Sequence, residues 1–279
     1  MARASGRGAA AVKILITADI HYTLKQYDWL MQIGPGFDLV ILAGDLLDAF
    51  STVDPRVQIA VVEKYLARLA AKTRLMVCSG NHDLDARDEH GERVAQWIAK
   101  GVRASGIPAD GDAVSVDGIL FSICPWWDGP LTKDRIGAQL ARDAKAEKKR
   151  WIWVYHAPPI GSRISHEMRE FGDAELARWI DEYQPDLVFC GHVHNAPFRP
   201  DGSWIDTRGR TFVFNAGRQI GEVPTHVMLD VEESSALWFS LMGPQTAALD
   251  KPLTFPVPNL TAAPAWLTAM DQAGGQNPA

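Results

Sequence analysis

Apolar and polar positions along this chain follow a pattern typical of a mixed α/β protein. Nearly continuous apolar runs at residues 13–18, 38–42, 74–78, 151–155 and 187–190 predict buried strands. Stretches with helical spacing of apolar residues predict helices at residues 23–33, 88–100, 132–149 and 173–183. A further helix opens at Asp54-Pro55, a good N-cap residue followed by a proline in the first turn. Strands that alternate with helices imply an α/β core with parallel strands.

Three pairs of short strands add antiparallel structure to this core. Residues 113–116 and 119–123 flank Asp117-Gly118, which is a strong hairpin signal. Residues 204–214 and 225–241 contain similar strand pairs, so we expect a second, partly antiparallel sheet packed on the first. From residue 244 the composition shifts to Pro, Ala, Gly and Thr. The expected organisation is therefore a leader at 1–12, a catalytic domain at 13–243 and a tail at 244–279.

Residues of metal-ligand type follow five of the predicted strands. In open α/β sheets, ligands bind at the carboxyl ends of the strands, so we expect these five clusters to converge on one edge of one sheet. Taken singly, each cluster is weak evidence, because an Asp after a strand is usually a turn residue or a helix cap. Their joint occurrence favours a metal site. The clusters are Asp19-Ile20-His21, Gly44-Asp45-Leu46-Leu47-Asp48, Gly80-Asn81-His82-Asp83, His156, and Gly191-His192-Val193-His194.

The residue types in these clusters indicate which ions they would bind. Carboxylate oxygen and imidazole nitrogen suit zinc, iron and manganese. The alternate spacing of Asp19 with His21, and of His192 with His194, can direct two side chains into one site. Glycine precedes three of the clusters and allows the backbone to turn sharply at a crowded centre.

Composition and charge narrow the class of protein. The formal net charge of −6 argues against tight nonspecific binding to nucleic acid. No apolar stretch approaches the ~18 residues of a membrane span, and the apolar run after the basic N-terminus is too short for a signal peptide. We therefore expect a cytoplasmic protein without a membrane partner. The three cysteines share no CxxC spacing and are expected to be buried free thiols.

The ordered set DxH, GDxxD, GNHD, H and GHxH resembles the calcineurin-like metallophosphoesterase superfamily. All five motifs occur in order between Asp19 and His194. The resemblance implies a four-layer αββα sandwich, in which two mixed β-sheets are flanked by helices. It also implies hydrolysis of a phosphate mono- or diester with two bound metal ions, each of them manganese, iron or zinc.

The resemblance also implies a role for each motif residue. In-line attack by a metal-bridging hydroxide is expected, with His82 as the general acid and Asp48 orienting it. Asp83 is expected to form the turn or to support a ligand. One ion is expected on Asp19, His21 and His194, the other on Asn81, His156 and His192, with Asp45 shared by both.

One departure from the family pattern bears on the substrate. Ser/Thr protein phosphatases of this superfamily continue the second motif with Arg-Gly, whereas Ala49-Phe50 follows Asp48 here. A dedicated protein phosphatase is therefore disfavoured, and a small-molecule or nucleotide-type ester is expected. A metal-dependent nuclease is the alternative, although the acidic charge counts against it. A non-catalytic scaffold is a third possibility, which retention of His82 and Asp48 disfavours.

Two loops are candidates for contacting the substrate. Residues 125–130 include Trp126 and Trp127, which could stack on a base or merely pack the rim of the site. Residues 158–169 include Arg163, which could contact phosphate or only solvent.

Overall fold

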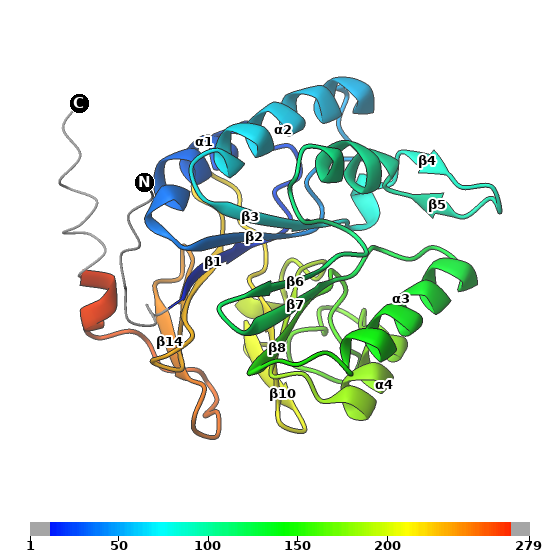
Figure 1. Ribbon diagram of the computed structural model, residues 1–279. Coiled ribbons are helices and arrows are strands. Elements are labelled where there is room, and N and C mark those ends of the chain that lie inside the picture. Colours follow the sequence, from blue (N-terminus) through cyan, green and yellow to red (C-terminus); the bar gives the residue numbers. More distant parts are fainter. Residues whose placement is uncertain (1–11, 269–279) are drawn as a thin grey trace, which may run out of the picture.

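Two six-stranded mixed sheets pack face to face, with helices on both outer faces (Figure 1). The computed structural model describes residues 12–268. The first sheet has the order β14-β13-β12-β1-β2-β3. Its strands are β1 (Lys13–Thr17), β2 (Leu39–Ala43), β3 (Arg74–Cys78), β12 (His226–Asp230), β13 (Ser235–Phe239) and β14 (Gln245–Ala248). Within it, β1, β2 and β3 run parallel, and the other three are antiparallel additions.

The second sheet has the order β10-β11-β9-β8-β7-β6. Its strands are β6 (Ala113–Val116), β7 (Ile119–Ile123), β8 (Arg150–Val154), β9 (Leu187–Cys190), β10 (Ile205–Arg208) and β11 (Thr211–Asn215). The strands β7, β8, β9 and β11 are parallel, and each edge is completed by a hairpin. The expected four-layer αββα sandwich is confirmed.

Three apolar clusters explain why the central strands are apolar throughout. One cluster lies between the sheets and includes Ile16, Ile41 and Phe121. The other two lie under the helices, one outside each sheet. A central strand is thus covered on both faces, so that both sets of alternating side chains are buried.

Helices α1 (Leu24–Ile33) and α2 (Pro55–Ala70) cover the first sheet, and α3 (Pro130–Asp143) and α4 (Ala174–Tyr183) cover the second (Figure 1). Asp54 caps α2 by accepting the Arg56 N–H at 2.8 Å. Asp173 caps α4 in the same way, with the Glu175 N–H at 2.7 Å. These caps satisfy backbone donors that the first helical turn leaves free.

The helix expected at residues 88–100 is wrong. A small hairpin, β4 (Ala86–Arg87) and β5 (Arg93–Val94), occupies its first half, and a π-helical segment follows at Trp97–Val102. The Asp88 carboxylate accepts the backbone N–H groups of His90 and Glu92 at 2.9 and 3.1 Å. Side-chain bonds of this kind compete with helix formation and here stabilise a turn.

The helix expected at residues 132–149 is shorter than the pattern indicated, since α3 ends at Asp143. Lys148 Nζ donates to the carbonyls of Asp143 and Ala144 at 2.9 and 2.8 Å. A cation that binds the last carbonyls of a helix stabilises its end. The basic residues that follow α3 are thus partly used to terminate it.

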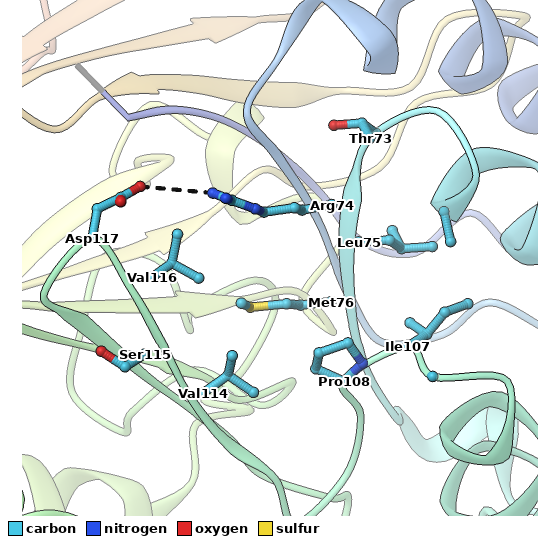
Figure 2. A pocket seen from close by; sticks show the side chains of 12 residues that line it. Thr73, Arg74, Leu75, Met76, Ile107, Pro108, Val114, Ser115, Val116 and Asp117 are labelled. Atoms are coloured by element: carbon cyan, nitrogen blue, oxygen red, sulfur yellow. Dashed lines mark ion pairs between the residues drawn. The ribbon is translucent and has the colours of Figure 1, made fainter. Parts of the chain in front are cut away.

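A cavity of about 480 Å³ lies between the edge strands of the two sheets (Figure 2). Met76 on β3 and Val114 on β6 line it, and an ion pair between Arg74 and Asp117 lies at one side (3.6 Å). The lining includes the beginning of β3, and no residue of the five ligand clusters contributes to it.

The remaining expectations concern the C-terminal region, the thiols and the membrane. Residues 245–248 form β14, and Trp266 is buried in the cluster outside the first sheet. Residues 1–11 of the leader expected at 1–12 lie outside the described residues. The three cysteines are buried and free, as expected. Among residues 12–268, no helix combines the length and the apolar character needed to cross a membrane.

Candidate metal centre

The five ligand clusters meet where the two sheets come together, and not on one sheet as expected. Three clusters follow the parallel strands β1, β2 and β3 of the first sheet, and two follow β8 and β9 of the second. The two sheets pack with these carboxyl ends near one another, so both contribute to one centre. The side chains brought there are Asp19, His21, Asp45, Asp48, Asn81, His82, His156, His192 and His194.

Four of these residues have left-handed backbone conformations. The φ angles are 56° at Asp19, 45° at His21, 54° at Asp45 and 71° at His192. A residue with a side chain in this region costs about 1–3 kcal/mol in the less favourable cases, and such residues collect at functional sites. Backbone bonds between the turns compensate, with Asp19 N–H donating to Gly44 and His21 N–H donating to Asp45, both at 3.0 Å.

Glycines allow the turns to approach one another closely. A Cβ on Gly80 would lie 2.5 Å from the Asp45 backbone nitrogen and 2.8 Å from the Asp45 Cγ. A Cβ on Gly44, where φ is +91°, would lie 2.7 Å from the His156 ring. Both separations are shorter than real Cβ contacts, so the glycines in these motifs are required by the crowding of the ligands.

A first group of ligand atoms is formed by Asp19, His21, Asp45 and His194. The His21 and His194 Nε2 atoms lie 3.0 Å apart. His194 Nε2 is 3.3 Å from Asp19 Oδ1, and His21 Nε2 is 3.6 Å from Asp45 Oδ2. Two imidazole nitrogens and two carboxylate oxygens thus lie within 4.8 Å of one another, close enough to hold one metal ion.

A second group is formed by Asp45, His156 and His192, with Asn81 beside them. His156 Nε2 is 3.2 Å from Asp45 Oδ2, and the Asn81 amide oxygen is 2.8 Å from His192 Nδ1. His156 Nδ1 is 2.7 Å from the Ala43 carbonyl oxygen, which fixes the ring. An outer hydrogen bond of this kind commonly orients a metal-binding imidazole. Asp45 is the one residue common to both groups.

The donor set fits metal binding. His156 Nε2 is buried and makes no hydrogen bond of good geometry within residues 12–268, although Asp45 is close. Burial by itself would lower the pKa of His156, but the charges of Asp45 and Asp19 outweigh it and raise the pKa to about 9. The pKa of Asp19 stays well below its usual value despite burial, because the imidazoles of His194 and His21 lie 3.3 and 3.8 Å from its carboxylate. Buried carboxylates beside imidazole nitrogens are donors of the kind that zinc, iron and manganese bind.

His82 lies beside the first group, with its ring centroid 4.4 Å from that of His21. The Ala49 N–H donates to His82 Nδ1 at 3.1 Å, which leaves the proton of a neutral ring on Nε2. Asp48 Oδ1 is 3.9 Å from His82 Nδ1, too far for a hydrogen bond, and instead accepts the Phe50 N–H at 2.9 Å. Asp48 thus shapes the turn whose N–H contacts His82. Burial, opposed by Asp45 and aided by His21, lowers the pKa of His82.

Asp83 lies beneath the centre and joins two motif turns. It is fully buried and accepts the N–H groups of Leu46, Leu47 and Gly80 at 3.0, 2.9 and 2.8 Å. Burial and the nearby Asp45 raise its pKa to about 8. These contacts place Asp83 as a turn-forming residue.

Arg218 is a candidate that the sequence analysis missed. Its backbone N–H donates to the His194 carbonyl at 3.0 Å. The pKa of His194 is raised, because the effect of Asp19 outweighs burial and the nearby charge of Arg218, both of which lower it. The Arg218 side chain is half-buried and has no ion-pair partner within residues 12–268. In the sequence, Arg218 is marked as a candidate only by its position directly after Asn215-Ala216-Gly217, a segment that follows a predicted strand. Arg163, in contrast, lies over the Phe255 ring and bonds to the Asp201 carbonyl.

Solved structures with the same fold resemble the chain at low identity. The protein TT1561 of Thermus thermophilus matches with a TM-score of 0.54 and 16% identity, covering 86% of this chain and 100% of that chain. A dimetal phosphatase from Danio rerio matches with a TM-score of 0.48 and 12% identity, over 82% of this chain and 95% of that one. Likeness at these identities shows the fold alone.

A search of curated proteins returned no match. A model described as calcineurin-like phosphoesterase matches residues 12–196, which contain all five ligand clusters. Because this match spans more than half of the sequence, the chain belongs to the calcineurin-like phosphoesterase family.

Proposed function

We propose that the chain is a metal-dependent hydrolase of phosphate mono- or diesters with a small-molecule or nucleotide-type substrate. The observation that carries this proposal is the pair of ligand groups that share Asp45. The family acts on phosphate esters, and the donor types suit manganese, iron or zinc. The proposed ligands are Asp19, His21 and His194 for one ion and Asn81, His156 and His192 for the other, with Asp45 shared.

When bound, two metal ions supply Lewis acidity and an activated water at neutral pH. The chain's own groups perform the remaining tasks. Arg218 binds a non-bridging phosphate oxygen, since it is cationic, unpaired within residues 12–268 and close to His194. The Asn81 amide orients His192 and the phosphate together.

His82 is proposed as the general acid that protonates the leaving oxygen in the in-line displacement. The position of His82 supports this role, because its ring lies 4.4 Å from the His21 ring of the first ligand group, measured between centroids. The acid form is the imidazolium, which carries a proton on both nitrogens, so forming it replaces the bond that Nδ1 accepts from the Ala49 N–H, and the Nε2 proton is then transferred to the leaving oxygen. Asp48 is proposed to act through the turn that presents this N–H, and not by direct contact with the imidazole. Positioned proton transfer typically contributes about 10²–10⁴-fold to the rate.

The test compares two variants with the unaltered protein after loading with manganese. Asp45→Asn is expected to lose metal and hydrolysis together, as measured by metal analysis and by release of p-nitrophenol from p-nitrophenyl phosphate and bis(p-nitrophenyl) phosphate. His82→Ala is expected to keep its metal and to slow most for esters with poor leaving groups. Full activity of His82→Ala on an alkyl phosphate would overturn the general-acid role. An unaltered protein that binds less than one ion and hydrolyses neither ester would overturn the proposal itself.

A further inference from the structure

A pocket of about 460 Å³ opens beside His192 at the rim of the metal centre. Three aromatic residues, Trp126, Trp127 and Phe171, contribute to its lining, together with Lys133 from the first turn of α3. The Trp126 ring lies 5.1 Å from the His192 ring and 5.7 Å from the His156 ring, measured between centroids. The pocket is therefore continuous with the second ligand group. Its volume is within the range of small-molecule sites.

Both tryptophans are held in place by hydrogen bonds to buried or half-buried groups. The backbone N–H of Trp126 donates to Ser79 Oγ at 2.8 Å, and the backbone N–H of Ser79 donates in turn to the Asp110 carboxylate. Trp127 Nε1 donates to Tyr155 Oη at 2.7 Å and to Asp173 Oδ2 at 3.0 Å. The Trp127 ring is thus held by its own indole bonds, whereas the Trp126 ring is held by its anchored backbone and by packing against His192 and His156. Such rings form a preorganised surface, because little conformational entropy is lost when a ligand packs on them.

The two flanks of the metal centre contact different halves of the ligand set. His82 lies against His21 of the first group, and the 88%-exposed Phe50 lies beyond it, 5.3 Å from His82 between ring centroids. Trp126 contacts only the second group, at His156 and His192. If the leaving group departs beside His82, the pocket at Trp126 is left for a second organic arm. A monoester has one such arm and a diester has two.

We infer that the substrate is a phosphodiester whose retained arm is a planar aromatic group that stacks in the Trp126 pocket. This inference rests on the proposed function, since it assumes hydrolysis at the metal centre with His82 on the leaving side. Aryl and nucleobase arms share the chemistry that an aromatic wall recognises. Lys133, whose Nζ lies 5.7 Å from the centroid of the Trp127 ring, is paired with Glu175 of the same pocket at 3.8 Å, so the aromatic surface and not a free positive charge is what the pocket offers a ligand.

The experiment keeps one leaving group and changes the retained arm. Manganese-loaded protein is assayed with ethyl p-nitrophenyl phosphate, phenyl p-nitrophenyl phosphate and the p-nitrophenyl ester of thymidine 5′-monophosphate, together with p-nitrophenyl phosphate. The two aromatic arms are expected to raise kcat/KM over the ethyl arm by about 5- to 100-fold, the range for one stacked ring. A higher value for the phenyl or the thymidine arm identifies the aryl or the nucleobase source.

Trp126→Ala is expected to bring the aromatic-to-ethyl ratio of kcat/KM close to one, and because the Trp126 ring packs against His156 and His192 the ratio is compared at equal metal content, not at equal absolute rate. Trp126→Phe should restore part of the ratio. Trp29→Ala is the matched control, because Trp29 is also half-buried but does not line the pocket. A ratio near one in the unaltered protein, or one that Trp126→Ala does not change, overturns the inference.

Two further outcomes separate this inference from the proposed function. Hydrolysis of p-nitrophenyl phosphate with none of the diesters overturns the inference and leaves the proposed function standing. If no ester is hydrolysed, the proposed function fails, and the pocket is judged by tryptophan fluorescence. Diphenyl phosphate that binds at least about 5-fold tighter than diethyl phosphate then supports the aromatic arm, and equal affinity overturns it.

Discussion

Gly80→Ala is expected to disable the metal centre while leaving the fold intact. Gly80 has φ −113° and ψ −175°, an extended conformation that alanine adopts without strain. The whole effect therefore comes from the new Cβ. It would lie 2.5 Å from the backbone nitrogen of Asp45, whereas real Cβ contacts stay above 3.0 Å. Asp45 would have to move by at least about 0.5 Å, which exceeds the ~0.2 Å within which metal–ligand distances are held.

Because Asp45 belongs to both ligand groups, this displacement should lower the affinity of the protein for both ions. Disturbing the support of a metal ligand typically costs about 10–100-fold in affinity, and a displaced shared ligand should reach the upper end. The measurement is metal content after equilibration at several free manganese concentrations, with circular dichroism as the check on folding.

Gly137→Ala is the matched control for this substitution. Its Cβ would lie 3.6 Å from the Trp179 indole nitrogen, an ordinary contact, and alanine is favoured inside a helix such as α3 by about 1 kcal/mol. This variant should bind metal normally and be equally or more stable. Unaltered manganese affinity in Gly80→Ala would refute the assignment of Asp45 as the ligand that both ions share.

Three further predictions follow from the site and its surroundings. Arg218→Ala should lower kcat/KM by about 10–100-fold through loss of a charged hydrogen bond, with partial recovery in Arg218→Lys, and an unchanged kcat/KM would contradict the contact. Burial lowers the pKa of His226 to about 4, so its stabilising contribution is complete above pH ~6.5 and is lost toward pH 4, by about 3 kcal/mol. The free energy of unfolding measured with urea should accordingly vary less with pH in His226→Phe than in the unaltered protein. The same dependence of this free energy on pH in both proteins would disprove the prediction. Chelation should lower the free energy of unfolding by about 2.7 kcal/mol for each ion whose free concentration was 100 times its Kd, and Asp45→Asn should not respond.

Local errors in the sequence analysis arose where side chains compete with the apolar pattern. Residues 88–100 carry helical spacing, yet the Asp88 carboxylate binds two backbone N–H groups and forms a turn. Lys148 likewise binds the carbonyls at the end of α3, and the helix stops before the basic residues. Neither competition is visible in periodicity, because it depends on the geometry of single side-chain bonds.

Sequence alone determined the layer architecture and the candidate ligand residues. Continuous apolar runs require strands that are covered on both faces, and ligand residues directly after such strands are carried to the carboxyl ends. The burial of a strand and the position of a ligand residue at its carboxyl end both depend on neighbouring residues and on the direction of the strand. Both can therefore be predicted from the order of residues.

Tertiary structure alone decided how the clusters are combined. The packing of two sheets brings Asp45 of one sheet next to His156 of the other, and no sequence spacing encodes that distance. The same packing brings Trp126 to His192, and a tight turn at Asp48 presents the Ala49 N–H to His82. Contacts of this kind depend on the relative placement of whole layers, which is fixed by the shared apolar core and by close approaches such as that of Gly80 to Asp45.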